Sequence, residues 1–202
     1  MVKSGGWLML PIILCSVISI SIIVERFWSL QREKVLPRHL VASVWHMIKT
    51  GKLEASKIEE VGRQSALGKV LTAGVKNRQY KRERIKESIE ERGREVVHEL
   101  ERFLSPLGTI ASISPLLGLL GTVVGMIKVF TAITTHGVGN PAVLANGISQ
   151  AMITTAAGLS VAIVSLIFYR YFMRRVDTIV VEIEREAIKM VDVIHKSREG
   201  QV

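Results

Sequence analysis

The stretch PLLGLLGTVVGMIKVF, from Pro115 to Phe130, decides the fold class of this chain. It carries no charge before Lys128, which is typical of a segment that lies in lipid. Gly118, Gly121, Thr122 and Gly125 nevertheless recur on one side of a helix. We therefore predict a transmembrane helix with a stripe of small and hydroxylated side chains that faces protein or water instead of lipid.

The apolar residues of the whole chain are concentrated in blocks. Hydrophobic residues make up 48% of the 202 positions, and the mean hydropathy is +0.31. Uncharged runs cover residues 4–24, 103–127 and 129–169, and about 20 apolar residues suffice for a helix to cross the bilayer core. These runs predict an integral membrane protein with three transmembrane helices.

The distribution of basic residues predicts how the chain is oriented. Of 27 Lys and Arg, 18 lie between Glu25 and Phe103 and seven lie from Arg170 onward. Basic loops stay on the cytoplasmic side, so the N-terminus and the short second loop are expected on the opposite, periplasmic side. The ERFWSLQREK sequence after the first helix offers no small-residue cleavage site, which favours a retained anchor over a signal peptide.

The expected fold is all-α, with two of the three transmembrane helices extended into a cytoplasmic helical bundle. The predicted segments are an N-terminal segment with transmembrane helix 1 (1–28), a cytoplasmic helical region (29–103), transmembrane helix 2 (104–133), a short periplasmic loop (134–144), transmembrane helix 3 (145–173) and a cytoplasmic C-terminal helix (174–202).

An apolar seam follows the third transmembrane helix with the spacing of a packed helix. It can pack against the charged helix that precedes transmembrane helix 2, or against another copy of the chain. Its members are Val176, Ile179, Val180, Ile183, Ala187, Met190, Val191 and Ile194.

Several classes of function are disfavoured. The motifs of metalloproteases, phosphate-binding loops and nucleophile elbows are absent, so no catalytic residues and no cofactor are predicted. The five His residues do not approach ligand spacing, so no metal site is predicted. The basic block KNRQYKRERIK contains one Tyr and no nucleic-acid-binding module, so the net charge of +9 indicates topology instead of nucleic-acid binding.

The third transmembrane helix carries a second stripe of small residues. Thr155 of this helix and Thr122 of the second come to similar depth when counted from equivalent ends. Plain helix packing explains such stripes, and a pore lined by hydroxyl groups is the alternative that we favour. The stripe comprises Gly147, Ala151, Thr154 or Thr155, Gly158, Ala162 and Ser165.

No Asp or Glu occurs in transmembrane helices 2 and 3 or in the loop between them. A threonine can order water and pass on hydrogen bonds, but it does not titrate near neutral pH. If protons cross the membrane here, the ionisable group is therefore expected on another chain.

The segments GGWLMLPIILCSVISISIIVERFW, SPLLGLLGTVVGM and NPAVLANGISQAMITTAAGLSVAI resemble the MotA/TolQ/ExbB proton channel family, specifically its ExbB and TolQ branch. The resemblance implies a homo-oligomer, a pentamer, in a bacterial inner membrane, whose pore encloses a single-span partner of the ExbD/TolR kind with an intramembrane Asp. It implies a client of the TonB or TolA kind, and pore threonines at Thr122 and Thr155. Family members often carry glutamate where this chain has Gln150, which can form hydrogen bonds across the pore mouth but cannot act as a base.

The sequence therefore predicts a non-enzymatic stator subunit that couples proton-motive force to mechanical work on an envelope protein. The alternative is a non-conducting scaffold that packs and stabilises a partner's transmembrane helix; in both cases the chain also contacts membrane lipids. The residues expected in the proton pathway are Thr122, Thr155, Thr154 and Gln150. The small residues expected to pack helices are Gly118, Gly121, Gly125, Gly147, Ala151, Gly158 and Ala162.

Overall fold

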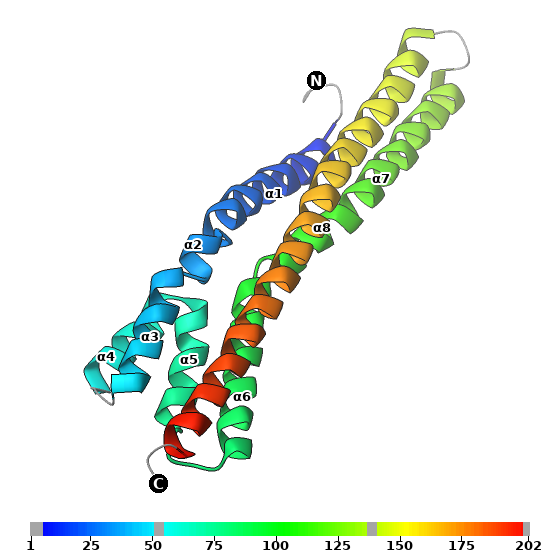
Figure 1. Ribbon diagram of the computed structural model, residues 1–202. Helices are drawn as coiled ribbons and strands as arrows, with labels where there is room; N and C mark the ends of the chain where they lie inside the picture. The colour runs from blue at the N-terminus through cyan, green and yellow to red at the C-terminus, as the bar shows by residue number, and fades with distance from the viewer. Residues whose placement is uncertain (1–5, 51–54, 137–140, 200–202) are drawn as a thin grey trace. The chain divides into compact units, whose positions relative to one another are not determined.

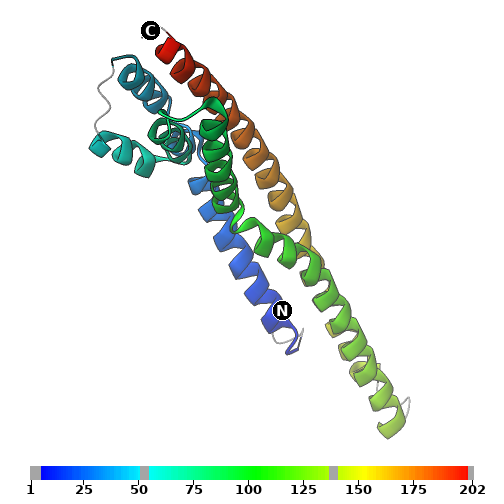
Figure 2. The same cartoon turned by 90° about the horizontal axis from the view of Figure 1, so that it is seen from below.

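The computed structural model describes residues 6–50, 55–136 and 141–199, and every regular element in these ranges is a helix (Figures 1 and 2). The elements are α1 (Met9–Ser29), α2 (Arg32–Val35), α3 (Arg38–Thr50), α4 (Ala55–Gln64), α5 (Ala66–Lys76), α6 (Arg82–Glu101), α7 (Leu104–His136) and α8 (Pro141–Glu199). Of the short loop expected at 134–144, residues 137–140 lie outside the described ranges, and its flanks belong to α7 and α8.

Three of the described helices are long and apolar enough to cross a membrane. These spans are Met9–Ser29, Leu104–Thr135 and Leu144–His195, with mean hydropathies of 2.0, 2.0 and 2.1. Only 28%, 22% and 28% of their most apolar windows is buried within the chain, so most of these side chains remain available to lipid or to other protein. The predicted all-helical fold with three spanning helices is confirmed.

The chain divides into two compact units, and the boundary between them falls within α1 and α8. The first, which we call the membrane unit, comprises Met1–Glu25 and Phe103–Tyr171. In it, the hydroxyl groups of Ser19 in α1 and Ser165 in α8 form a hydrogen bond of 2.7 Å, and both side chains are buried. Ser114 and Ser165 also donate to carbonyl oxygens one turn earlier in their own helices, which satisfies polar groups away from water.

The second unit, which we call the charged unit, comprises Arg26–Arg102 and Phe172–Val202. Within it α6 runs alongside the C-terminal part of α8 (Figures 1 and 2). The apolar seam predicted on α8 is buried within this unit except for the half-buried Val180. Packing within the same chain therefore accounts for the seam, without contact to another copy. Gly74 of α5 leaves room for this packing, because a methyl group at Gly74 would overlap the Met190 side chain and lie 2.9 Å from Cδ1 of Ile89.

Candidate functional site

The glycine stripe of α7 lies against α8 of the same chain. Gly118 is closest to the backbone of Thr154 and Thr155, Gly121 to the Thr154 side chain, and Gly125 to Ala151 and Gly147. Residue numbers fall along α8 as they rise along α7, so the two helices are antiparallel. The stripe therefore contacts the matching stripe of the next helix.

Small residues are needed at this contact because the two backbones come close together. A methyl group added at Gly158 would lie 2.5 Å from the carbonyl oxygen of Ser114, and one at Gly125 would lie 2.8 Å from Cβ of Ala151. A methyl group at Gly121 would overlap the Thr154 side chain. All of the predicted packing residues are buried, namely Gly118, Gly121, Gly125, Gly147, Ala151, Gly158 and Ala162.

The three candidate threonines differ in exposure. Thr154 has no exposed surface, because it sits in the contact between α7 and α8. Thr122 and Thr155 are only half-buried. Within the membrane unit, these two hydroxyl-bearing residues thus remain accessible to a molecule outside the α7–α8 contact, and Thr154 does not.

Each threonine donates its hydroxyl proton to a backbone carbonyl oxygen. The Thr155 hydroxyl lies 3.0 Å from the oxygen of Gly118 in α7 and 3.2 Å from that of Ala151 in its own helix. The Thr122 hydroxyl donates to Leu119 at 2.6 Å. A hydroxyl has one proton and two lone pairs, so a hydroxyl whose proton is engaged offers only acceptor sites to a further partner.

Gln150 lies on a different flank of the helix pair from Thr155. Successive helix positions are about 100° apart, which places Thr155 and Gln150 on opposite sides of the buried Ala151 and Thr154 stripe.

The same geometry applies to α7, where Thr122 and Lys128 lie on opposite sides of the Gly121 and Gly125 stripe. Consistent with this arrangement, Lys128 Nζ donates to Gln150 Oε1 at 3.1 Å. The candidate pathway residues thus separate into a threonine flank (Thr122 and Thr155), a buried Thr154, and Gln150 on the side of Lys128.

The membrane helices supply few ionisable groups. No Asp or Glu occurs in α7 or in residues 141–171 of α8, and Lys128 is the one Lys or Arg of α7. Within the described ranges no three His, Cys, Asp or Glu side chains cluster as metal ligands would. The chemistry available on the threonine flank is therefore that of hydroxyl oxygens that accept hydrogen bonds.

Sequence reasoning missed two polar contacts of α1. One is the buried hydrogen bond between Ser19 and Ser165. The other is in the charged unit, where the buried Arg26 donates to the carbonyl oxygen of Leu100 at 3.0 Å. Ser19 gives a weak signal as a polar residue in an apolar run, whereas the position of Arg26 at the end of that run does not indicate a partner in α6.

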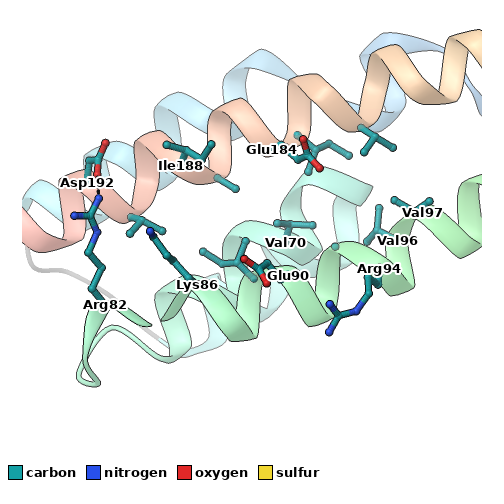
Figure 3. Close-up of a pocket in the computed structure, with 16 residues that line it drawn as sticks. Val70, Arg82, Lys86, Glu90, Arg94, Val96, Val97, Glu184, Ile188 and Asp192 are labelled. Carbon is teal, nitrogen blue, oxygen red and sulfur yellow. Dashed lines mark hydrogen bonds and ion pairs between the residues drawn. The ribbon is translucent and has the colours of Figure 1, made fainter. Parts of the chain in front are cut away.

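The charged unit contains a groove of about 630 Å³ between α6 and α8, with Val70 of α5 at its base (Figure 3). Its floor is mostly aliphatic, and Arg82 and Asp192 form an ion pair of 2.8 Å at one end. The charges around it balance, so the groove favours neither an acidic nor a basic ligand. The charged lining residues are Arg82, Lys86, Arg94, Glu90, Glu184 and Asp192.

These features define a class: a multi-pass helical membrane protein whose second and third spans pack through small residues and present hydroxyl groups on one flank. Residues 62–185 match the MotA/TolQ/ExbB proton channel family. The chain belongs to this family, which is one of transport channels and not of enzymes.

Individual relatives agree with this assignment. The chain is 36% identical over 174 residues to an ExbB-like protein of Synechocystis sp.. The matched region covers 82% of this chain and 66% of that protein. It is 51% identical over 67 residues to the biopolymer transport protein exbB1 of Vibrio cholerae, covering 33% of this chain and 29% of the relative. It is 42% identical over 72 residues to the biopolymer transport protein ExbB of Salmonella typhimurium, and the match covers 36% of this chain and 30% of that relative. The chain thus spans less than two thirds of the length of these curated relatives.

Proposed function

We propose that this chain is the proton-channel subunit of an inner-membrane stator that couples proton-motive force to work on a TonB- or TolA-like envelope protein. The observation that carries the proposal is the accessible threonine flank of the α7–α8 pair, together with the lack of a carboxylate in these membrane segments. The titrating Asp belongs to a single-span partner of the ExbD/TolR kind. Each proton that crosses 100 mV of potential releases about 2.3 kcal/mol for this work.

The hydrogen bonds of the threonines support a specific role. Because Thr155 and Thr122 donate their protons to backbone carbonyls, their lone pairs can accept from water or from a protonated carboxyl group. They give no comparable stabilisation to a carboxylate, which needs donors. The threonine flank therefore favours the protonated form of the partner's Asp while that group is inside the membrane, where a charge is costly.

The proposal requires several copies of the chain. In a lone subunit the half-buried threonines would face hydrocarbon, whereas a closed ring turns the threonine flank toward a common axis. We propose five copies, as the family resemblance implies.

A non-conducting scaffold is the second candidate. The observation that favours it is that all three threonine hydroxyls are satisfied by backbone carbonyls, so helix packing alone accounts for them. A scaffold would bind the partner helix without moving protons. Proton flux distinguishes the two functions.

The test is proton flux into liposomes that contain the chain purified together with its partner, driven by a potassium diffusion potential and followed with an entrapped pH dye. We expect flux with the wild-type partner and none when its membrane Asp is replaced by Asn. Native mass spectrometry of the same sample should show several copies of this chain. An assembled complex that binds the partner but passes no protons would favour the scaffold, and a monomer would exclude the ring.

We further propose that the N-terminus and the α7–α8 connection face the periplasm, because the basic residues concentrate in the charged unit. In a Cys15→Ser background, Thr134→Cys is expected to react with an impermeant maleimide added to intact spheroplasts. Glu60→Cys, which is also exposed, should react only after the membrane is opened. The opposite labelling pattern would reverse the orientation.

A further inference from the structure

The interaction between Lys128 and Gln150 connects α7 and α8 on the flank opposite Thr122 and Thr155. Lys128 Nζ and Gln150 Oε1 are 3.1 Å apart. Because an ammonium group can only donate hydrogen bonds, the oxygen of the Gln150 amide must face Lys128. The amide nitrogen Nε2, which is a donor, therefore points the other way.

The nitrogen of Gln150 lies against the backbone at Gly6, just before α1. A methyl group at Gly6 would overlap Nε2 and lie 3.1 Å from Cδ of Gln150. Gly6 also has a φ of 71°, a left-handed backbone conformation that residues other than glycine rarely adopt. Its carbonyl oxygen accepts from the N–H of Met9 at 3.1 Å and so begins the first turn of α1.

We propose that Gln150 is a positioning residue that bridges Lys128 of α7 and the first turn of α1, and so holds that turn on the α7–α8 pair. Only an amide suits both sides, since its oxygen accepts from Lys128 and its nitrogen places a donor group against the Gly6 turn. A glutamate would pair with Lys128 but would present no donor to the turn. The bridge therefore accounts for a glutamine at this position, and it requires no role of Gln150 in proton transfer.

The bridge predicts a local effect on α1 that does not depend on proton conduction. In hydrogen exchange measured on the assembled protein in nanodiscs, Gln150→Glu should speed exchange of the amides of Met9, Leu10, Ile12 and Ile13 by about tenfold, the equivalent of one lost hydrogen bond. Gly6→Ala should also raise exchange, because the added methyl group displaces the amide and because alanine disfavours the φ of 71°, so Gln150→Glu is the deciding variant. Lys128→Met should raise exchange less, since the contact between Gln150 and the Gly6 turn survives.

Ser149→Ala is the matched control, because Ser149 is the exposed neighbour of Gln150 on the same helix. It should leave exchange of α1 unchanged, and none of the variants should alter exchange of residues 151–160 in the α7–α8 contact. Unchanged exchange of the amides of Met9, Leu10, Ile12 and Ile13 in Gln150→Glu would overturn the bridge, whatever the result for Gly6→Ala. Unchanged exchange combined with lost proton flux in Gln150→Glu would instead return Gln150 to the pore. General loosening of all three helices would also refute a local positioning role.

Discussion

Gly121→Ala is expected to destabilise the α7–α8 pair by about 1–3 kcal/mol, the range seen when a packed core receives one methyl group too many. The new methyl group would lie 2.5 Å from Cβ of Thr154 and would overlap its hydroxyl, on a residue that is completely buried. Neither helix can move away without breaking the adjacent contacts at Gly118 and Gly125. The measurement is the thermal unfolding midpoint of the detergent-solubilised protein from tryptophan fluorescence, together with its amount in the membrane.

Gly93→Ala provides the matched control for Gly121→Ala. Gly93 lies within α6, and nothing comes within 4 Å of a methyl group added there. Alanine should therefore stabilise α6 through its higher helix propensity, by up to about 1 kcal/mol. A second change, Thr154→Gly, removes the side chain that Gly121→Ala strikes, so the double variant should recover part of the lost stability. Equal unfolding midpoints for Gly121→Ala and Gly93→Ala would show that the two helices do not touch at Gly121.

The spanning helices could be predicted from sequence because they depend on a property that each segment carries by itself. A helix in lipid must be about 20 residues long, largely apolar and satisfied in its own backbone hydrogen bonds. The runs around Val17, Leu120 and Ile163 meet these conditions without reference to their neighbours. The small residues Gly121 and Gly158 could likewise be placed on one side of their helices from periodicity alone, whereas Thr154 and Thr155 remained alternatives.

The packing partners of Gln150 could not be predicted in the same way. Periodicity gives the angle of a residue on its own helix, but not which neighbour covers that angle. The close approach of Gly6 to Gln150 involves residues 144 positions apart, and the Ser19–Ser165 bond joins residues 146 positions apart. The family resemblance placed Gln150 at the pore mouth, whereas its packing partners distinguish its surroundings from those of Thr155.

Thr155→Val is expected to lower proton flux through the assembled complex by about tenfold, the rate equivalent of one lost hydrogen bond of about 1.4 kcal/mol. Valine has nearly the same shape as threonine but lacks the oxygen whose lone pairs would accept from water or from the partner's protonated Asp. The change also removes the bond to the Gly118 carbonyl, so a stability loss of about 1 kcal/mol should accompany it. Flux is therefore compared at equal amounts of assembled complex.

A change at the adjacent residue, Thr154, tests whether a fall in proton flux requires loss of the Thr155 hydroxyl or follows from loss of any buried hydroxyl. Thr154→Val deletes the same group one position away, where it has no exposed surface and donates only to carbonyls of its own helix. It should keep wild-type flux, and Thr155→Ser, which retains the oxygen, should keep most of it. An equal fall in Thr154→Val and Thr155→Val would assign both effects to helix packing. Full flux in assembled Thr155→Val would remove this hydroxyl from the proton pathway and leave the contact with Gly118 as its role.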